Sequence, residues 1–170
     1  AVEKRTSNFK ILKQNLQEVE NKFDFIMLNH SFEHMESPKE SISHLSKLLN
    51  PRGTIMIRIP VVPCYAWKVY GVDWVQLDAP RHFFIHSIES ISILCKSANL
   101  KIDSVRFDST AFQFYGSELY KNNIPLYKSS TRTDLGFIDA NLEKFYEKAI
   151  DLNKNDDGDQ ACFFLVKNSQ

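Results

Sequence analysis

Glycine is scarce in this sequence: five of the 170 residues are glycine, and no two of them are separated by a single residue. The chain therefore holds no G-x-G turn of the kind that lets the backbone approach a bound nucleotide. Cysteine is scarce too, with Cys64, Cys95 and Cys162 widely spaced in apolar segments. This pattern excludes a disulfide framework and a zinc knuckle, and it predicts buried free thiols in a reducing compartment.

The chain also lacks an excess of charge, because Lys and Arg number 21 and Asp and Glu number 21. No net field would draw it to nucleic acid or to an anionic membrane. It has no apolar run near the roughly 20 residues that cross a bilayer, and no leader at its start. We expect a cytoplasmic protein whose partner is a small molecule or another protein.

What the sequence does contain is an alternation of apolar strand patterns and amphipathic helix patterns. Helices are predicted to follow the N-caps Ser37, Ser87 and Asp139, and Asn99 stands where a left-handed residue would end the second helix. The predicted strands lie at residues 9–12, 23–28, 54–59, 101–107 and 161–166. Such an alternation predicts one α/β domain over residues 1–170 with a largely parallel sheet, which binds ligands outside the carboxyl ends of its strands.

Two long segments interrupt this alternation. Residues 61–86 and 108–138 are rich in aromatic side chains and exceed an ordinary connection in length. Loops of this length are usually functional. We therefore expect them to form lids or insertions on the substrate side of the sheet.

The stretch HSFEH at residues 30–34 matches the H-x-x-E-H pattern of zinc peptidases. That chemistry needs both histidines on successive turns of one helix. Here a strand runs directly into His30, and the next helix starts only after Ser37, so a loop at the carboxyl end of a strand is the better interpretation. His30, Glu33 and His34 could together hold a metal ion, but only Glu33 offers the carboxylate that hard cations prefer, and we predict none.

Several passages resemble the class I S-adenosylmethionine-dependent methyltransferases of the small-molecule branch. They are FDFIMLNHSFEH (residues 23–34), LLNPRG (48–53), WVQLDAPRH (74–82), and the shorter matches at 85–87 and 98–100. The resemblance implies a Rossmann-like three-layer α/β/α sandwich with a mostly parallel sheet. It also implies that the last strand is antiparallel and lies between the two strands that precede it in the family's order.

The resemblance is incomplete at the start of the chain. The family's glycine-rich turn after its first strand and the acidic residue ending its second strand have no counterpart before residue 9. We therefore expect that the first two strands of the fold are missing, and that the strand at residues 9–12 is the third.

By resemblance, several residues would contact the cofactor S-adenosyl-L-methionine. Asn15 would accept from the adenine amino group and Leu16 would pack on the ring, although Asn15 could equally be an ordinary polar strand end. Asn29 and His30 would contact the methionine part, largely through backbone, and His34 would lie on the same loop. Glu33 and His34 could instead only satisfy backbone groups around Ser37.

The resemblance also implies catalytic and acceptor-binding residues. His82 is the candidate general base, since an ordinary histidine titrates near neutral pH, and Asp78 would orient it. Arg81 could hold an acidic group of the substrate. The aromatic residues Tyr65, Trp67 and Trp74 are expected to form the wall of the acceptor site. A purely structural turn at residues 78–82 remains the alternative.

The sequence thus predicts a methyltransferase acting on a small-molecule acceptor, with a homodimer as a further expectation. A catalytically silent methyltransferase-like binding module is the alternative, supported by the absent glycine-rich turn. The H-x-x-E-H zinc peptidase is a remote third.

Overall fold

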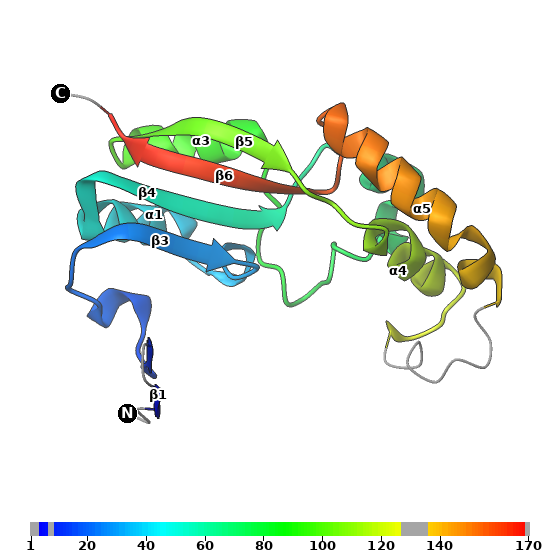
Figure 1. Cartoon of the computed structure of the whole chain (residues 1–170), viewed down its shortest axis with the longest axis horizontal. Helices are drawn as coiled ribbons and strands as arrows, with labels where there is room; N and C mark the ends of the chain where they lie inside the picture. Colours follow the sequence, from blue (N-terminus) through cyan, green and yellow to red (C-terminus); the bar gives the residue numbers. More distant parts are fainter. Residues whose placement is uncertain (1–3, 7–8, 127–135, 169–170) are drawn as a thin grey trace.

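The main sheet of the protein has four strands. The computed structural model describes residues 4–6, 9–126 and 136–168. Within them the sheet order is β3 (Phe23–Asn29), β4 (Leu49–Pro60), β6 (Gln160–Lys167) and β5 (Leu100–Phe107). β3 and β4 are parallel, and β6 is antiparallel to both β4 and β5. The predicted antiparallel last strand, inserted between two strands that run the other way, is confirmed (Figure 1).

Most strands of the sheet run in the same direction, but most neighbouring strands are antiparallel. β3, β4 and β5 run the same way, but because β6 separates β4 from β5, the only parallel neighbours among the described strands are β3 and β4. The predicted α/β class is confirmed, and the expectation of a largely parallel sheet holds for strand direction only.

Two helices, α1 (Pro38–Leu48) and α3 (Ile88–Ser97), pack on one face of the sheet (Figure 1). Both begin where the sequence predicts, and the hydroxyl of Ser87 accepts a hydrogen bond from the Ser90 amide at 3.0 Å. Asn99 follows α3 with a φ of 56°, the predicted left-handed conformation. The core between helices and sheet is aliphatic and aromatic; its fully buried members include Phe32, Ile42, Leu45, Ile55, Ile57, Ile59, Ile91 and Phe163.

A strand forms at the predicted residues 9–12, but its predicted place as the third strand of the main sheet is wrong. β2 (Phe9–Ile11) pairs in antiparallel register with β1 (Lys4–Thr6), which lies just before it in the sequence. The strand therefore pairs with its neighbour in the sequence and not with the main sheet. Among the described strands β3 has one neighbour, β4, and Phe25 and Met27 on β3 are 54% and 60% exposed.

The other α-helices gather beyond the carboxyl ends of β3, β4 and β5, whereas the short helix η1 (Leu16–Glu18) lies in the N-terminal segment (Figure 1). Residues 61–86 contain α2 (Tyr65–Tyr70) and the short helix η3 (Gly71–Asp73). Residues 108–138 contain α4 (Phe112–Lys121), and their residues 127–135 lie outside the described part of the chain. α5 begins at Gly136, earlier than the predicted start at Asp139, and ends at Lys154. The role of residues 61–86 and 108–138 as lids or substrate-side insertions stays a prediction.

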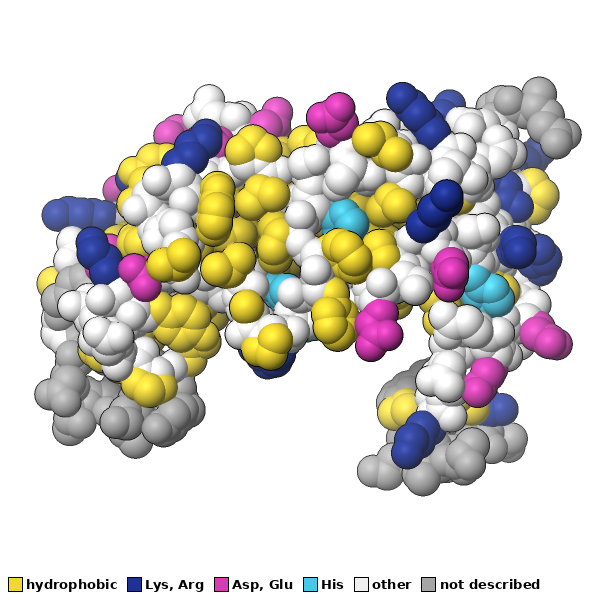
Figure 2. All heavy atoms as spheres, turned by 180° about the vertical axis from the view of Figure 1, so that it is seen from behind, with side chains coloured by type: hydrophobic (Ala, Val, Ile, Leu, Met, Phe, Trp, Pro, Cys, Tyr) yellow, Lys and Arg dark blue, Asp and Glu magenta, His cyan; other side chains and the backbone are white. Residues whose placement is uncertain are grey.

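The surface on the helix side of the sheet carries hydrophobic side chains (Figure 2). Exposed residues on α3 and in the segment before it include Phe83, Phe84, Ile88 and Ile93. No helix in the described residues has the length and apolar character that crossing a membrane requires. The three cysteines are buried, as predicted, and burial raises the pKa of Cys95 to about 11.

Candidate functional site

The loop that leaves β3 is the centre of the candidate site. His30 has a φ of 47°, and its amide donates to the carbonyl of Arg58 on β4 at 2.9 Å. This reversal turns the chain into the single-turn helix η2 (Phe32–His34), where Phe32 is completely buried in the core. His30 and His34 therefore do not share an α-helix. The geometry of an H-x-x-E-H peptidase is absent here, and the predicted strand-end loop is confirmed.

Glu33 is the least expected residue of this loop, because it is fully buried. Neither of its carboxylate oxygens has a hydrogen-bond partner in the described structure. Its Oε1 lies 3.3 Å from His30 Nδ1 and 4.0 Å from His82 Nε2. Its backbone carbonyl accepts from the Phe83 amide at 2.9 Å, which ties the 61–86 segment to this loop.

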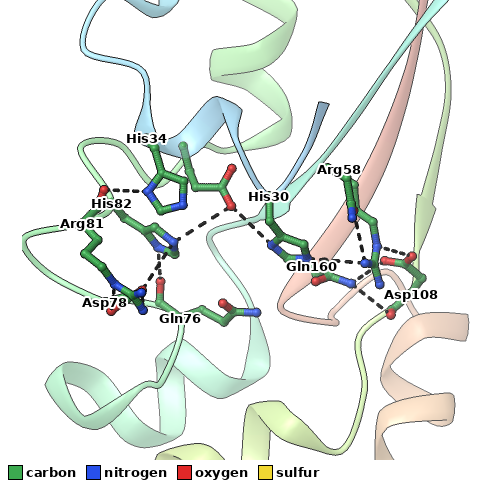
Figure 3. A network of polar contacts seen from close by, with 11 residues as sticks. His30, His34, Arg58, Gln76, Asp78, Arg81, His82, Asp108 and Gln160 are labelled. Atoms are coloured by element: carbon green, nitrogen blue, oxygen red, sulfur yellow. Dashed lines mark hydrogen bonds and ion pairs between the residues drawn. The ribbon is translucent and has the colours of Figure 1, made fainter. Parts of the chain in front are cut away.

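The imidazoles of His34 and His82 lie side by side, with ring centroids 4.8 Å apart. His34 Nδ1 lies 2.7 Å from the Arg81 carbonyl, and His82 Nδ1 lies 2.8 Å from the Gln76 carbonyl. A carbonyl can only accept, so each Nδ1 carries a proton, and in the neutral ring each Nε2 keeps its lone pair. Figure 3 shows both rings beside the turn that carries Asp78 and Arg81.

Asp78 has Arg81 as its main partner. The Arg81 guanidinium donates two hydrogen bonds to the Asp78 carboxylate, one from Nε at 3.1 Å and one from Nη2. This pairing raises the pKa of Arg81. Asp78 Oδ2 lies 3.8 Å from His82 Nε2, too far for a hydrogen bond. The His82 proton on Nδ1 is held by Gln76 instead. Asp78 therefore acts on His82 through its charge alone.

A second polar cluster lies at the carboxyl end of β4, and its members are paired (Figure 3). Arg58 Nε donates to Asp108 Oδ2 at 2.7 Å, and Gln160 Nε2 donates to Asp108 Oδ1 at 2.8 Å. Arg58 Nη1 also reaches Asn29 Oδ1 at 3.4 Å. Cys162 lies against Asp108, and burial is the main cause that raises the pKa of its thiol to about 11. This cluster links β3, β4, β5 and β6.

Asp159, which precedes β6, is a buried carboxylate with one strong donor. Its Oδ2 accepts from the indole Nε1 of Trp74 at 3.0 Å. Burial raises the pKa of Asp159 to about 6, partly opposed by the hydrogen bond from Trp74. A carboxylate with such a pKa is a typical candidate for proton transfer near neutral pH.

Two adjoining cavities open among these residues. One has a volume of about 210 Å³, and the other about 390 Å³. They share His30, Gln76 and Phe112 as lining residues. The smaller cavity is also lined by Glu33, His34, Val75, Asp78, Arg81, His82, Tyr120 and Leu126. The larger is also lined by Arg58, Thr110, Gln113, Asp159 and Gln160.

The structure brings together about half of the residues that the sequence singled out. His30, His34, Asp78, Arg81 and His82 line the smaller cavity, and Asn29 contacts Arg58, which lines the larger one. The other residues line neither cavity: they are Asn15, Leu16, Tyr65, Trp67 and Trp74.

The residues outside the cavities have structural contacts instead. Asn15 bonds to Glu18 within the N-terminal segment, and Leu16 packs partly buried against the main core. Trp74 is completely buried, Trp67 lies edge-on against it at 6.0 Å, and Tyr65 stacks edge-on against Phe114. Tyr65, Trp67 and Trp74 therefore have ring contacts within the protein, and their role as the wall of an acceptor site stays a prediction.

The sequence did not single out several of the residues that line the cavities. Arg58 and Asp159 belong to strand ends, where a charged residue flanking an apolar run was the available signal. Phe112 and Tyr120 on α4 were noted only as part of an aromatic segment. Their convergence depends on long-range contacts that a single sequence does not reveal.

A family model described as a methyltransferase domain matches residues 2–105 of the chain. No curated protein sequence matches it significantly. Solved structures match it well: a methyltransferase of Haloferax volcanii, in complex with the Trm112 methyltransferase activator, has a TM-score of 0.59 at 12% identity, over 98% of this chain and 65% of that chain.

Two further structures have the same fold. Mitomycin 7-O-methyltransferase has a TM-score of 0.55 at 8% identity, over 93% of this chain and 34% of its own. A mycolic acid cyclopropane synthase solved with S-adenosylhomocysteine has a TM-score of 0.54 at 14% identity, over 92% and 59%. The chain thus spans about a third to two thirds of the length of these proteins.

Proposed function

Because this chain belongs to the methyltransferase domain family, we propose that it transfers the methyl group of S-adenosylmethionine to a small-molecule acceptor. The observation that carries the proposal is the pair of adjoining cavities at the carboxyl ends of β3 and β4. Ligands of α/β sheets bind at this edge. The larger cavity, at about 390 Å³, has the size of an ordinary small-molecule site.

The described residues supply one part of a cofactor site, the loop that carries Asn29 and His30. Asn29 is exposed at the end of β3, and the left-handed turn at His30 directs the chain away from the sheet edge. This leaves strand-end backbone beside the shared wall of the two cavities. The cofactor supplies a methyl group on a positively charged sulfur. Asn15 and Leu16 have no support as its adenine contacts, because neither residue lines a cavity.

The acceptor would lie between apolar and polar walls. Phe112 is shared by both cavities, and Tyr120 lines the smaller one. Arg58 and Gln76, which also line the larger cavity, offer hydrogen-bond donors. Such a combination orients a small molecule that has an apolar body and a polar group. Orientation matters most for an in-line methyl transfer, because the acceptor atom must meet the methyl carbon in line.

Asp159 is the group that the geometry favours for taking a proton from the acceptor. It lines the larger cavity, it is buried, and burial raises its pKa to about 6. At neutral pH it is therefore ionised and still basic enough to accept a proton. The role of His82 and Asp78 as base and orienting residue stays a prediction, as does a homodimer.

The first test is calorimetric titration of S-adenosylhomocysteine into the 170-residue chain and into the longest polypeptide that its reading frame encodes. Binding by either, together with methyl transfer to members of a panel of small hydroxyl and amine compounds, is the expected result. Absence of binding by both would overturn the proposal and favour the silent module.

Variants of two neighbouring carboxylates test the role of Asp159. Asp159→Asn should lower kcat by about 100-fold or more, while affinity for S-adenosylhomocysteine changes little. Asp157→Asn is the matched control, because Asp157 pairs with Lys68 and lines neither cavity. Equal turnover in the two variants would remove Asp159 from the chemistry and leave it a structural role.

A further inference from the structure

We propose that Glu33, His34 and His82 form a binding site for one divalent transition-metal ion, of which Zn²⁺ is the test case. One ligand atom from each side chain lies within 4.8 Å of the other two. Glu33 and His34 come from η2, and His82 comes from the 61–86 segment, so the site would join two loops that are distant in sequence. This inference does not depend on the proposed methyl transfer.

The hydrogen bonds of both histidines are those of metal ligands. His34 donates a hydrogen bond from Nδ1 to the Arg81 carbonyl at 2.7 Å, and His82 donates one from Nδ1 to the Gln76 carbonyl at 2.8 Å. A histidine bound to a metal usually donates its second ring N–H to a carbonyl or carboxylate, which fixes the tautomer and the ring orientation. Two histidines with neighbouring rings, held in this way, present two free Nε2 atoms to the same space.

Glu33 supplies the second, independent observation. Its side chain is 1% exposed, and neither carboxylate oxygen has a hydrogen-bond partner in the described structure. A buried carboxylate without hydrogen bonds is costly, so such groups are normally paired or coordinate a metal. Among the titratable groups near Glu33 Oε1 are His30, with Nδ1 at 3.3 Å, and the proposed ligand His82, with Nε2 at 4.0 Å. A cation bound at His34 and His82 would neutralise this carboxylate.

The donor set indicates the class of metal. Two imidazole nitrogens and one carboxylate oxygen suit zinc and other first-row divalent ions, whereas Mg²⁺ and Ca²⁺ prefer oxygen ligands. Ligand atoms on a tetrahedral zinc ion are roughly 3.4 Å apart, so a small inward movement of these side chains would complete the site. The fourth position would face the cavity of about 210 Å³, which the same three residues line. Water or a polar atom of a small molecule could occupy it.

Two other interpretations use the same residues differently. In an H-x-x-E-H site, His30 would be a ligand and His82 would not. In an internal ion pair, Glu33 would face protonated His82 and His30, with no metal. Ligation at Nε2 also removes the lone pair that a general base uses, so the metal site and a basic role for His82 exclude each other.

The test is isothermal titration of Zn²⁺ into the chelator-treated chain, followed by the rise in Tm on adding the metal. We expect one equivalent to bind, with Tm rising as the metal concentration exceeds Kd. Glu33→Gln and His82→Ala should each weaken binding more than the roughly 10- to 100-fold cost of removing an outer-shell partner. Co²⁺ bound in place of Zn²⁺ should give the visible spectrum of a tetrahedral site, lost in the same variants.

Two controls keep the test specific. His44→Ala removes an imidazole on α1 that contacts the Val19 carbonyl and lines neither cavity, so it should bind Zn²⁺ as the wild type does. His30→Ala removes only a neighbour of Glu33, so it should cost no more than the roughly 10- to 100-fold of an outer-shell partner, whereas an H-x-x-E-H site would lose a ligand. No binding by the folded wild type, or equal binding by Glu33→Gln, His82→Ala and His44→Ala, would overturn the proposal and leave an internal ion pair.

Discussion

Between the sheet and helices α1 and α3 the buried side chains are almost all aliphatic or aromatic, whereas beyond the carboxyl ends of β3 and β4 carboxylates, histidines and amides are buried with them. Glu33, His86, Gln113 and Asp159 all belong to the second region. Burying polar groups costs free energy unless each is hydrogen-bonded. The helix-covered region therefore stabilises the fold, whereas the strand-end region carries the buried polar groups on which the proposed function depends.

The largest expected effect breaks the helix-covered core. Ile57 on β4 is completely buried there, so Ile57→Ala should lower the free energy of unfolding by about 2–5 kcal/mol. Urea unfolding measures this loss. Ile93→Ala is the control, because Ile93 on α3 is 60% exposed and its truncation should cost less than about 0.5 kcal/mol. Similar losses in both would mean that the core is not packed as described.

The second prediction concerns pH and the strand-end region. The pKa of Asp159 rises from 3.8 to about 6 on folding, so the folded state binds this proton more tightly than the unfolded state. The stabilising contribution is therefore complete below pH 4 and is lost as the pH rises through 6. Relative to Asp159→Asn, the wild type should lose about 3 kcal/mol between about pH 3 and pH 8. Unfolding curves at several pH values measure the difference, and parallel pH profiles would contradict it.

Trp74 tests the hydrogen bond that holds Asp159. Trp74→Phe keeps most of the buried ring but removes the indole N–H, so it should cost about 1–3 kcal/mol and raise the pKa of Asp159 further. Both can be followed by unfolding at pH 8 and by NMR titration of the carboxylate. Trp67→Phe is the control. Trp67 is 38% exposed, and its ring packs against Trp74 rather than donating to Asp159. A lowered pKa in Trp74→Phe would refute this account.

The two regions also differ in how far the sequence predicts them. The helix-covered core was predictable because its strands and helices have regular apolar periods and local caps, such as Ser87 and Asn99. The N-terminal strand was misplaced because an apolar run does not say which strand it pairs with, and a local hairpin was available.

The candidate site was predictable only in part, for a related physical reason. His30, His34 and His82 could be found from short motifs, because those motifs end strands or form turns. Arg58, Phe112 and Asp159 reach the cavities through contacts between distant segments. The period of a strand or helix carries no information on such contacts, nor on the ring contact between Trp67 and Trp74.

The smallest expected effect compares two carboxylates of the strand-end region, one without a hydrogen bond in the described structure and one with several. Asp108→Asn removes the charge that Arg58 and Gln160 contact, and because both partners of the ion pair are partly exposed, it should cost about 1 kcal/mol. Glu33→Gln makes the same chemical change in a fully buried group without hydrogen bonds. In chelator-treated protein at pH 8 it should instead stabilise the fold by about 1 kcal/mol, since an amide is cheaper to bury than a charge. Urea unfolding of both variants gives the sign of each effect. Loss of several kcal/mol in Glu33→Gln would mean that Glu33 is paired inside the protein, and the contrast between the two clusters would then disappear.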